Sequence, residues 1–145
     1  MTAPQRGPGV TVDTNSLAAR LTQATMAIVL AVISVLLMVT THRVRLEIGG
    51  VDWPAGLVFG GAFQVVACVF LYAATGSRLP VVVLGCLWGL LASPFLGRGA
   101  GGGVLMPAVI GEQTQYSGWI VQGLGVAIPF AVALVVTLRR RLSAR

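Results

Sequence analysis

The sequence predicts an all-α membrane protein, with four transmembrane helices in an antiparallel bundle and a short exterior β-hairpin between the first two. Two observations favour this class. Hydrophobic residues make up 56% of the 145 residues and charged residues only 10%, which is more apolar than a soluble domain requires. Four stretches also have apolar bodies close to the roughly 20 residues that cross a bilayer. They lie at about 17–41, 54–74, 79–96 and 118–138.

The first stretch is predicted to be an uncleaved helix. Asp13, Thr14, Asn15 and Ser16 all suit a helix N-cap, and the end of the stretch lacks the small-residue pattern of a signal-peptide cleavage site. The Pro- and Gly-containing segment before it is typical of disorder. The predicted organisation is therefore a disordered cytoplasmic tail (1–15), a four-helix transmembrane domain (16–138) and a basic cytoplasmic tail (139–145).

The loop after the first stretch carries a strand pattern. Val44, Leu46 and Ile48 alternate with charged residues, and Gly49-Gly50 then offers a two-residue turn. This alternation and turn predict a β-hairpin. Because a two-stranded ribbon is marginally stable in water, we expect it to lie on the membrane or on a partner.

Small and polar residues recur on helix faces in the later stretches. In 54–74 they are four residues apart, as are two glycines in 79–96, and such spacing lets helix backbones approach closely in lipid. We expect Gln64 to face protein, because an unpaired amide is costly in hydrocarbon. One option is a hydrogen bond to Ser93 or to backbone within the 54–96 hairpin, and the other is a bond across to a partner helix; we favour an internal, structural role. The helix-packing candidates are Gly56, Gly60, Gln64, Gly85, Gly89, Ser93 and Gln122.

The remaining loop and the last stretch add two expectations. Gly97–Ser117 is rich in glycine but lacks the Gly-Lys-Ser/Thr ending of a phosphate-binding loop, so it is interpreted as a flexible connection. In the last stretch Pro129 has no N–H to donate to the carbonyl of Gly125, which predicts a kink.

The arginines predict the topology. Arg139, Arg140 and Arg141 directly follow the last stretch, where basic residues anchor a helix on the cytoplasmic side. The other arginines favour the same orientation, with both termini inside and 41–53 and 97–117 outside. The net charge of +6 is thus attributed to anchoring and lipid contact. We expect a multi-pass plasma-membrane protein that binds no nucleic acid.

Few residues could support catalysis, proton transfer or metal binding. No Asp, Glu, His, Lys or Arg lies in the hydrophobic core of any stretch, whereas proton-coupled transporters normally carry such a residue. The loop residues His42, Glu47, Asp52 and Glu112 lack the tight spacing of a metal site. We therefore expect no enzyme activity, no metal and no cofactor.

Several features together resemble a known family. They are Ser93-Pro94 closing the third stretch, a Gly-rich connection, Gly118-Trp119 opening the fourth, and the Gly-Gly-Val-x-x-Pro run that ends at Pro54. This pattern resembles an uncharacterised actinobacterial family of small four-span membrane proteins that carry a domain-of-unknown-function label. The third loop here is longer than in that family. The resemblance implies a four-helix membrane fold and supplies no activity.

Two hypotheses for function follow. The first is a structural or accessory subunit that packs against a larger membrane complex or against itself, based on the glycine faces and the membrane glutamine. The second is a small oligomeric transporter or channel subunit, with Gln64, Ser93 and Gln122 lining a polar path between helices. In either case the lipid bilayer is the first expected partner.

Overall fold

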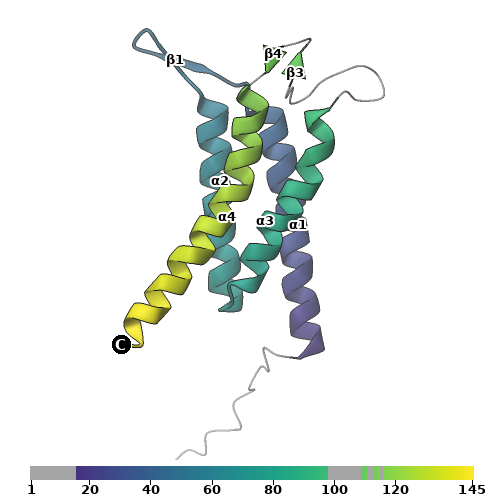
Figure 1. Ribbon diagram of the computed structural model, residues 1–145, viewed down its shortest axis with the longest axis vertical. Coiled ribbons are helices and arrows are strands. Elements are labelled where there is room, and N and C mark those ends of the chain that lie inside the picture. The colour runs from purple at the N-terminus through teal and green to yellow at the C-terminus, as the bar shows by residue number, and fades with distance from the viewer. Residues whose placement is uncertain (1–15, 98–108, 111–112, 115) are drawn as a thin grey trace, which may run out of the picture.

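The computed structural model describes residues 16–97, 109–110, 113–114 and 116–145. The predicted disordered tail and most of the Gly-rich connection therefore lie outside the described residues. The described part is mostly helical, and four of its helical segments are long and apolar enough to cross a membrane. The prediction of a mostly helical chain with four such segments is confirmed. Figure 1 shows α1 beginning at the same end at which α4 finishes.

The helices begin and end close to the predicted positions. The first, α1, covers Leu17–Thr41, and α2 covers Ala55–Thr75. Ser16 caps α1, with its side chain accepting a hydrogen bond from the backbone N–H of Ala19 at 3.2 Å. At the C-terminal end of α2, Gly76 adopts a left-handed φ of 62°. Such a C-terminal cap favours glycine, and it turns the chain directly into the next helix.

The third predicted span consists of two helix types. The α-helix α3 covers Leu79–Ala92, and a 3₁₀-helix η1 continues it over Ser93–Leu96. The change occurs at Pro94, which has no N–H for the carbonyl four residues earlier. At 1.5 Å per α-helical residue and 2.0 Å per 3₁₀ residue, the pair is about 29 Å long. Both parts are therefore needed to match a hydrocarbon layer of about 30 Å.

The β-hairpin predicted from the alternating residues is confirmed. Strand β1 (Leu46–Ile48) pairs antiparallel with β2 (Val51–Trp53). The two turn residues, Gly49 and Gly50, have φ values of 64° and 80°, which match a turn with two left-handed residues. Within the Gly-rich connection a second short pair occurs that the sequence analysis did not predict, β3 (Val109–Ile110) with β4 (Gln113–Thr114).

The last helix is longer than the predicted span. It covers Tyr116–Ser143 as α4 and has Pro129 inside it. The helix extends into the predicted basic tail at 139–145, since Arg139, Arg140 and Arg141 continue it. Arginine is a good helix former, and basic residues interact favourably with a helix C-terminus. Figure 1 shows the C-terminal half of α4 leaning away from the other helices.

The apolar core is divided along the helices into two clusters. The cluster near the α2–α3 turn includes Ala27, Cys68, Leu71 and Leu84. The cluster near the β1–β2 hairpin includes Val35, Met38, Trp88 and Val121. Large apolar side chains also cover the outside, where for example Val66 is 64% and Leu90 71% exposed. An apolar exterior of this kind is typical of helices that contact lipid.

Candidate functional site

A polar layer lies between the two apolar clusters. Ser34 of α1 and Gln64 of α2 are fully buried, with exposures of 1% and 0%. Trp88 of α3 is also 0% exposed and brings an indole N–H to the same level. In an apolar environment such groups are stable only when they are hydrogen-bonded. Their positions near the middle of three different helices make this layer the main candidate for a functional or organising centre.

The hydrogen bonds form one chain through all four helices. The indole Nε1–H of Trp88 donates to Oγ of Ser34 at 3.2 Å. That hydroxyl donates in turn to Oε1 of Gln64. The amide Nε2 of Gln64 then donates to the backbone carbonyl of Gly125 in α4, at 3.0 Å. Every member belongs to a different helix, so rotation of any one helix disturbs the connected hydrogen bonds.

The side chain of Gln64 replaces a backbone hydrogen bond that Pro129 cannot make. In a regular helix the residue at 129 donates its N–H to the carbonyl of Gly125, but proline has no N–H. Because that carbonyl is buried, leaving it unpaired costs about 1–3 kcal/mol. The side-chain amide of Gln64 supplies the missing donor. The predicted loss of the Gly125 bond is thus compensated from another helix.

Gly125 also permits the close approach of Trp88. A Cβ atom at position 125 lies only 2.3 Å from Cε2 of the Trp88 ring, far inside contact distance. Only glycine fits here without moving the indole. Gly125 therefore accepts a hydrogen bond from Gln64 of α2 and packs without a side chain against Trp88 of α3.

The predicted packing glycines of α2 face α1. A Cβ on Gly56 falls 1.7 Å from the carbonyl oxygen of Thr41, and one on Gly60 falls 2.3 Å from Sδ of Met38. In addition, the N–H of Gly56 donates to the carbonyl of Val44 at 3.0 Å, which ties the start of α2 to the segment after α1. These two glycines hold α1 and α2 together.

The predicted packing glycines of α3 face α4. A Cβ on Gly85 lies 3.0 Å from Cβ of Pro129, and one on Gly89 lies 3.3 Å from Cγ2 of Val126. The two glycine faces of the 54–96 hairpin therefore contact α1 and α4, rather than each other. This arrangement arises because α1 and α4 each pack against both hairpin helices.

Of the two options given for Gln64, the hydrogen bonds go across to other helices, α1 and α4, and not to Ser93 or to backbone inside the hairpin. Ser93 donates to the carbonyl of Gly89 in its own helix, at 2.6 Å. Gln122 of α4 donates to that same carbonyl at 3.2 Å, while its Oε1 is buried without a hydrogen-bond partner. Ser93 and Gln122 thus form a second, smaller polar contact between α3 and α4, separate from the central layer.

One further buried polar group lies at the hairpin end. His42 is 6% exposed, its Nδ1 lies 2.8 Å from the carbonyl of Val39, and its Nε2 has no hydrogen-bond partner. Among the described residues no group of three or more His, Cys, Asp or Glu could hold a metal ion.

Sequence reasoning missed Ser34 and Trp88. Ser34 is a polar residue in the middle of a long apolar run, and Trp88 lies mid-helix rather than at an end, where tryptophan usually marks the membrane interface. Both positions were signals of a buried hydrogen bond. The arrangement they complete joins helices, and its groups are a hydroxyl, an amide, an indole and a carbonyl, which do not ionise near neutral pH.

The chain was compared with protein-family models, with curated proteins and with solved structures, and none of them matches it.

Proposed function

We propose that this chain is a multi-pass protein of the plasma membrane that serves as a structural or accessory subunit of a membrane complex. The observation that carries this proposal is the central hydrogen-bond chain from Trp88 through Ser34 and Gln64 to Gly125. In these hydrogen bonds the buried polar groups of the helices bind one another within the same polypeptide. What is left for a partner is then the outer surface, including the exposed hairpin.

The hairpin offers the most suitable surface for a partner. Its residues Leu46, Ile48 and Trp53 are all more than half exposed. With Val58 and Phe59 of α2 they line an apolar groove of about 370 Å³. A two-stranded ribbon with both faces exposed gains little stability by itself. An apolar surface at this position fits a neighbouring membrane protein at the outer interface.

The experiment that tests this proposal is purification of the full chain from its native membrane in a mild neutral detergent. Co-purification of a second protein in a fixed ratio is expected. Ile48→Asp, which adds charge to the groove, should abolish that co-purification, whereas Glu47→Gln on the opposite face of the strand should preserve it. A chain that purifies alone, or a partner unaffected by Ile48→Asp, contradicts the proposal.

An oligomeric transporter or channel subunit is the second candidate. The buried, unpaired atoms Nε2 of His42 and Oε1 of Gln122 favour it, since a second subunit or a water path can supply their missing partners. Gln64 and Ser93, however, already have partners inside the chain. A homo-oligomer that dissociates on Gln122→Leu substitution supports this alternative, and a monomer excludes it.

The orientation is proposed from the charges at the two ends. One end carries Arg20, Arg78 and the α4 arginines, with no Asp or Glu among its described residues, whereas the other end balances Arg43 and Arg45 with Glu47 and Asp52. Basic residues stay in the cytoplasm, so both termini are placed inside. A reporter that is active only outside the cytoplasm should give no signal after Arg145 and a signal in the Gly49-Gly50 turn. The reverse pattern contradicts this orientation.

A further inference from the structure

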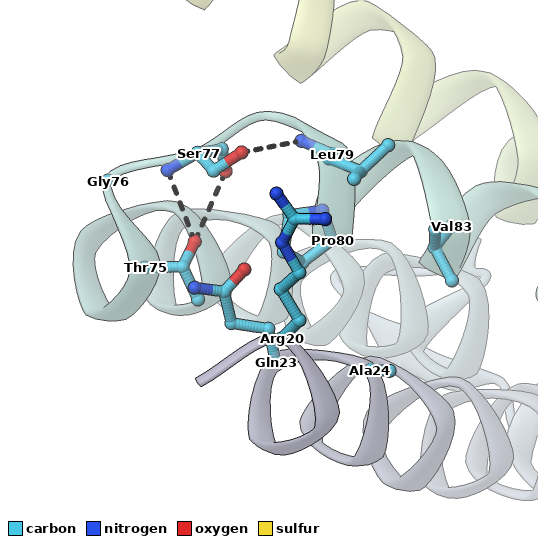
Figure 2. Close-up of a pocket in the computed structure, with 9 residues that line it drawn as sticks. All are labelled: Arg20, Gln23, Ala24, Thr75, Gly76, Ser77, Leu79, Pro80 and Val83. Carbon is cyan, nitrogen blue, oxygen red and sulfur yellow. Dashed lines mark hydrogen bonds between the residues drawn. The ribbon is translucent and has the colours of Figure 1, made fainter. Parts of the chain in front are cut away.

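A pocket opens at the arginine-rich end, between α1 and the turn that joins α2 to α3. Its volume is about 510 Å³. Figure 2 shows the side chains of Arg20 and Gln23 extending from α1 toward the turn, where Thr75 and Ser77 lie, with Pro80 and Val83 of α3 beside them. The pocket therefore has a polar wall at the helix ends and an apolar wall along the helices.

The polar wall presents hydrogen-bond donors that the protein leaves unused. Two other arginines at this end are occupied: Arg78 donates to Oγ1 of Thr137 at 2.8 Å, and Arg140 donates to the carbonyl of Gly76 and the hydroxyl of Tyr72. Arg20 has no hydrogen-bond or ion-pair partner within the part of the chain that the structure describes. Its guanidinium, with five N–H groups, is free to bind an anion.

Ser77 is arranged to add a second donor. Its Oγ accepts a hydrogen bond from the backbone N–H of Leu79 at 3.2 Å, and its own backbone N–H is held by Oγ1 of Thr75 at 3.2 Å. The hydroxyl hydrogen of Ser77 is then available to a ligand, as are the amide hydrogens of Gln23. A cation with several neutral donors and no nearby carboxylate among the described residues is suited to a phosphate group.

The apolar wall indicates which phosphate compound fits. Ala24 and Val83 continue the pocket toward the apolar exterior of α1 and α3, where Ile28 is 48% exposed and Cys86 is also exposed. A soluble phosphate gains nothing from such a wall, whereas an acyl chain does. The pocket thus offers a charged head and an apolar groove in one continuous surface.

We propose that this pocket binds an anionic phospholipid of the cytoplasmic leaflet. Arg20, Gln23 and Ser77 hold the phosphate, and an acyl chain lies along Ala24 and Val83. The site depends on the proposed membrane insertion but not on the accessory role, since it is a property of the single chain. Binding is therefore expected whether or not a protein partner is found.

The test is a lipid titration of the full chain in neutral detergent, followed by native mass spectrometry. Phosphatidylglycerol and phosphatidylcholine with identical acyl chains serve as the probes. The first phosphatidylglycerol should bind at least about fivefold more tightly than phosphatidylcholine. Arg20→Ala should weaken its binding about tenfold, because a charge-assisted hydrogen bond is lost. Equal binding of the two lipids, or an unchanged affinity in Arg20→Ala, overturns the proposal.

Matched variants separate the pocket from the general positive charge of this end. Arg145→Ala removes the same charge outside the pocket and should change the affinity by less than about twofold. Ser77→Ala removes the second donor and should weaken phosphatidylglycerol binding while leaving the charge intact. An equal loss in Arg145→Ala and Arg20→Ala contradicts a defined site.

A competition arm distinguishes the source of the phosphate. Inorganic phosphate at the same concentration as the lipid should fail to displace phosphatidylglycerol, because it does not use the apolar wall. Val83→Asn should weaken the lipid adduct for the same reason. Displacement by inorganic phosphate at equal concentration overturns the lipid assignment and points to a soluble anion.

Discussion

Two glutamines lie in the apolar part of this protein, and their surroundings differ. Gln64 is fully buried and uses both ends of its amide, accepting from Ser34 and donating to the carbonyl of Gly125. Gln122 is only partly buried; it donates to the carbonyl of Gly89, and its oxygen has no partner. The same side chain therefore joins three helices at one position and only two at the other. A buried amide stabilises this fold only where every polar atom of its surroundings is also satisfied.

The largest expected effect follows removal of the central glutamine. Gln64→Leu breaks two hydrogen bonds and leaves the Gly125 carbonyl without a donor. We expect a loss of about 2–4 kcal/mol in the free energy of unfolding in detergent, measured by denaturant or thermal unfolding. Partner binding at the hairpin should be retained once the protein is folded. Wild-type stability combined with loss of assembly would instead place Gln64 at an interface with another chain.

A smaller effect is expected when Gly125 gains a side chain. Gly125→Ala places a methyl group 2.3 Å from the Trp88 ring, so the indole must move away from Ser34. Overpacking of this kind costs about 1–3 kcal/mol. Gly123→Ala is the matched control, because nothing lies within 4 Å of a Cβ there. It should be neutral or stabilise the helix by up to about 1 kcal/mol. Equal unfolding free energies for the two variants contradict the close approach at Gly125.

The smallest effect is expected at the second glutamine. Gln122→Leu removes one hydrogen bond but also removes a buried oxygen that already lacks a partner. These two changes oppose each other, so we expect a change of less than about 1 kcal/mol in the free energy of unfolding. Thermal unfolding beside Gln64→Leu measures the contrast directly. A loss as large as that of Gln64→Leu shows that the oxygen of Gln122 is satisfied in the membrane by another chain.

The sequence predicted the helices better than their contacts. Hydrophobic length and turn residues located the helices and the β1–β2 hairpin, since both signals are local. The need of Gln64 for a protein partner, and the carbonyl freed by Pro129, were also predictable from chemistry alone. That these two groups bind each other depends on how α2 and α4 are rotated and ordered in space. No local pattern contains that information. The position of Ser34 within a long apolar run signals a buried hydrogen bond, but its partners depend on the same packing.

The measurement that tests the central hydrogen-bond chain most directly is a double-mutant cycle between Gln64 and Pro129. Pro129→Ala restores a backbone N–H for the carbonyl of Gly125. That carbonyl then no longer needs the hydrogen bond donated by Gln64. In that background Gln64→Leu should cost about 1–2 kcal/mol less than it does in the wild-type protein. If the two substitutions are additive to within about 0.5 kcal/mol, then Gln64 does not compensate for the proline, and the proposed link between α2 and α4 is wrong.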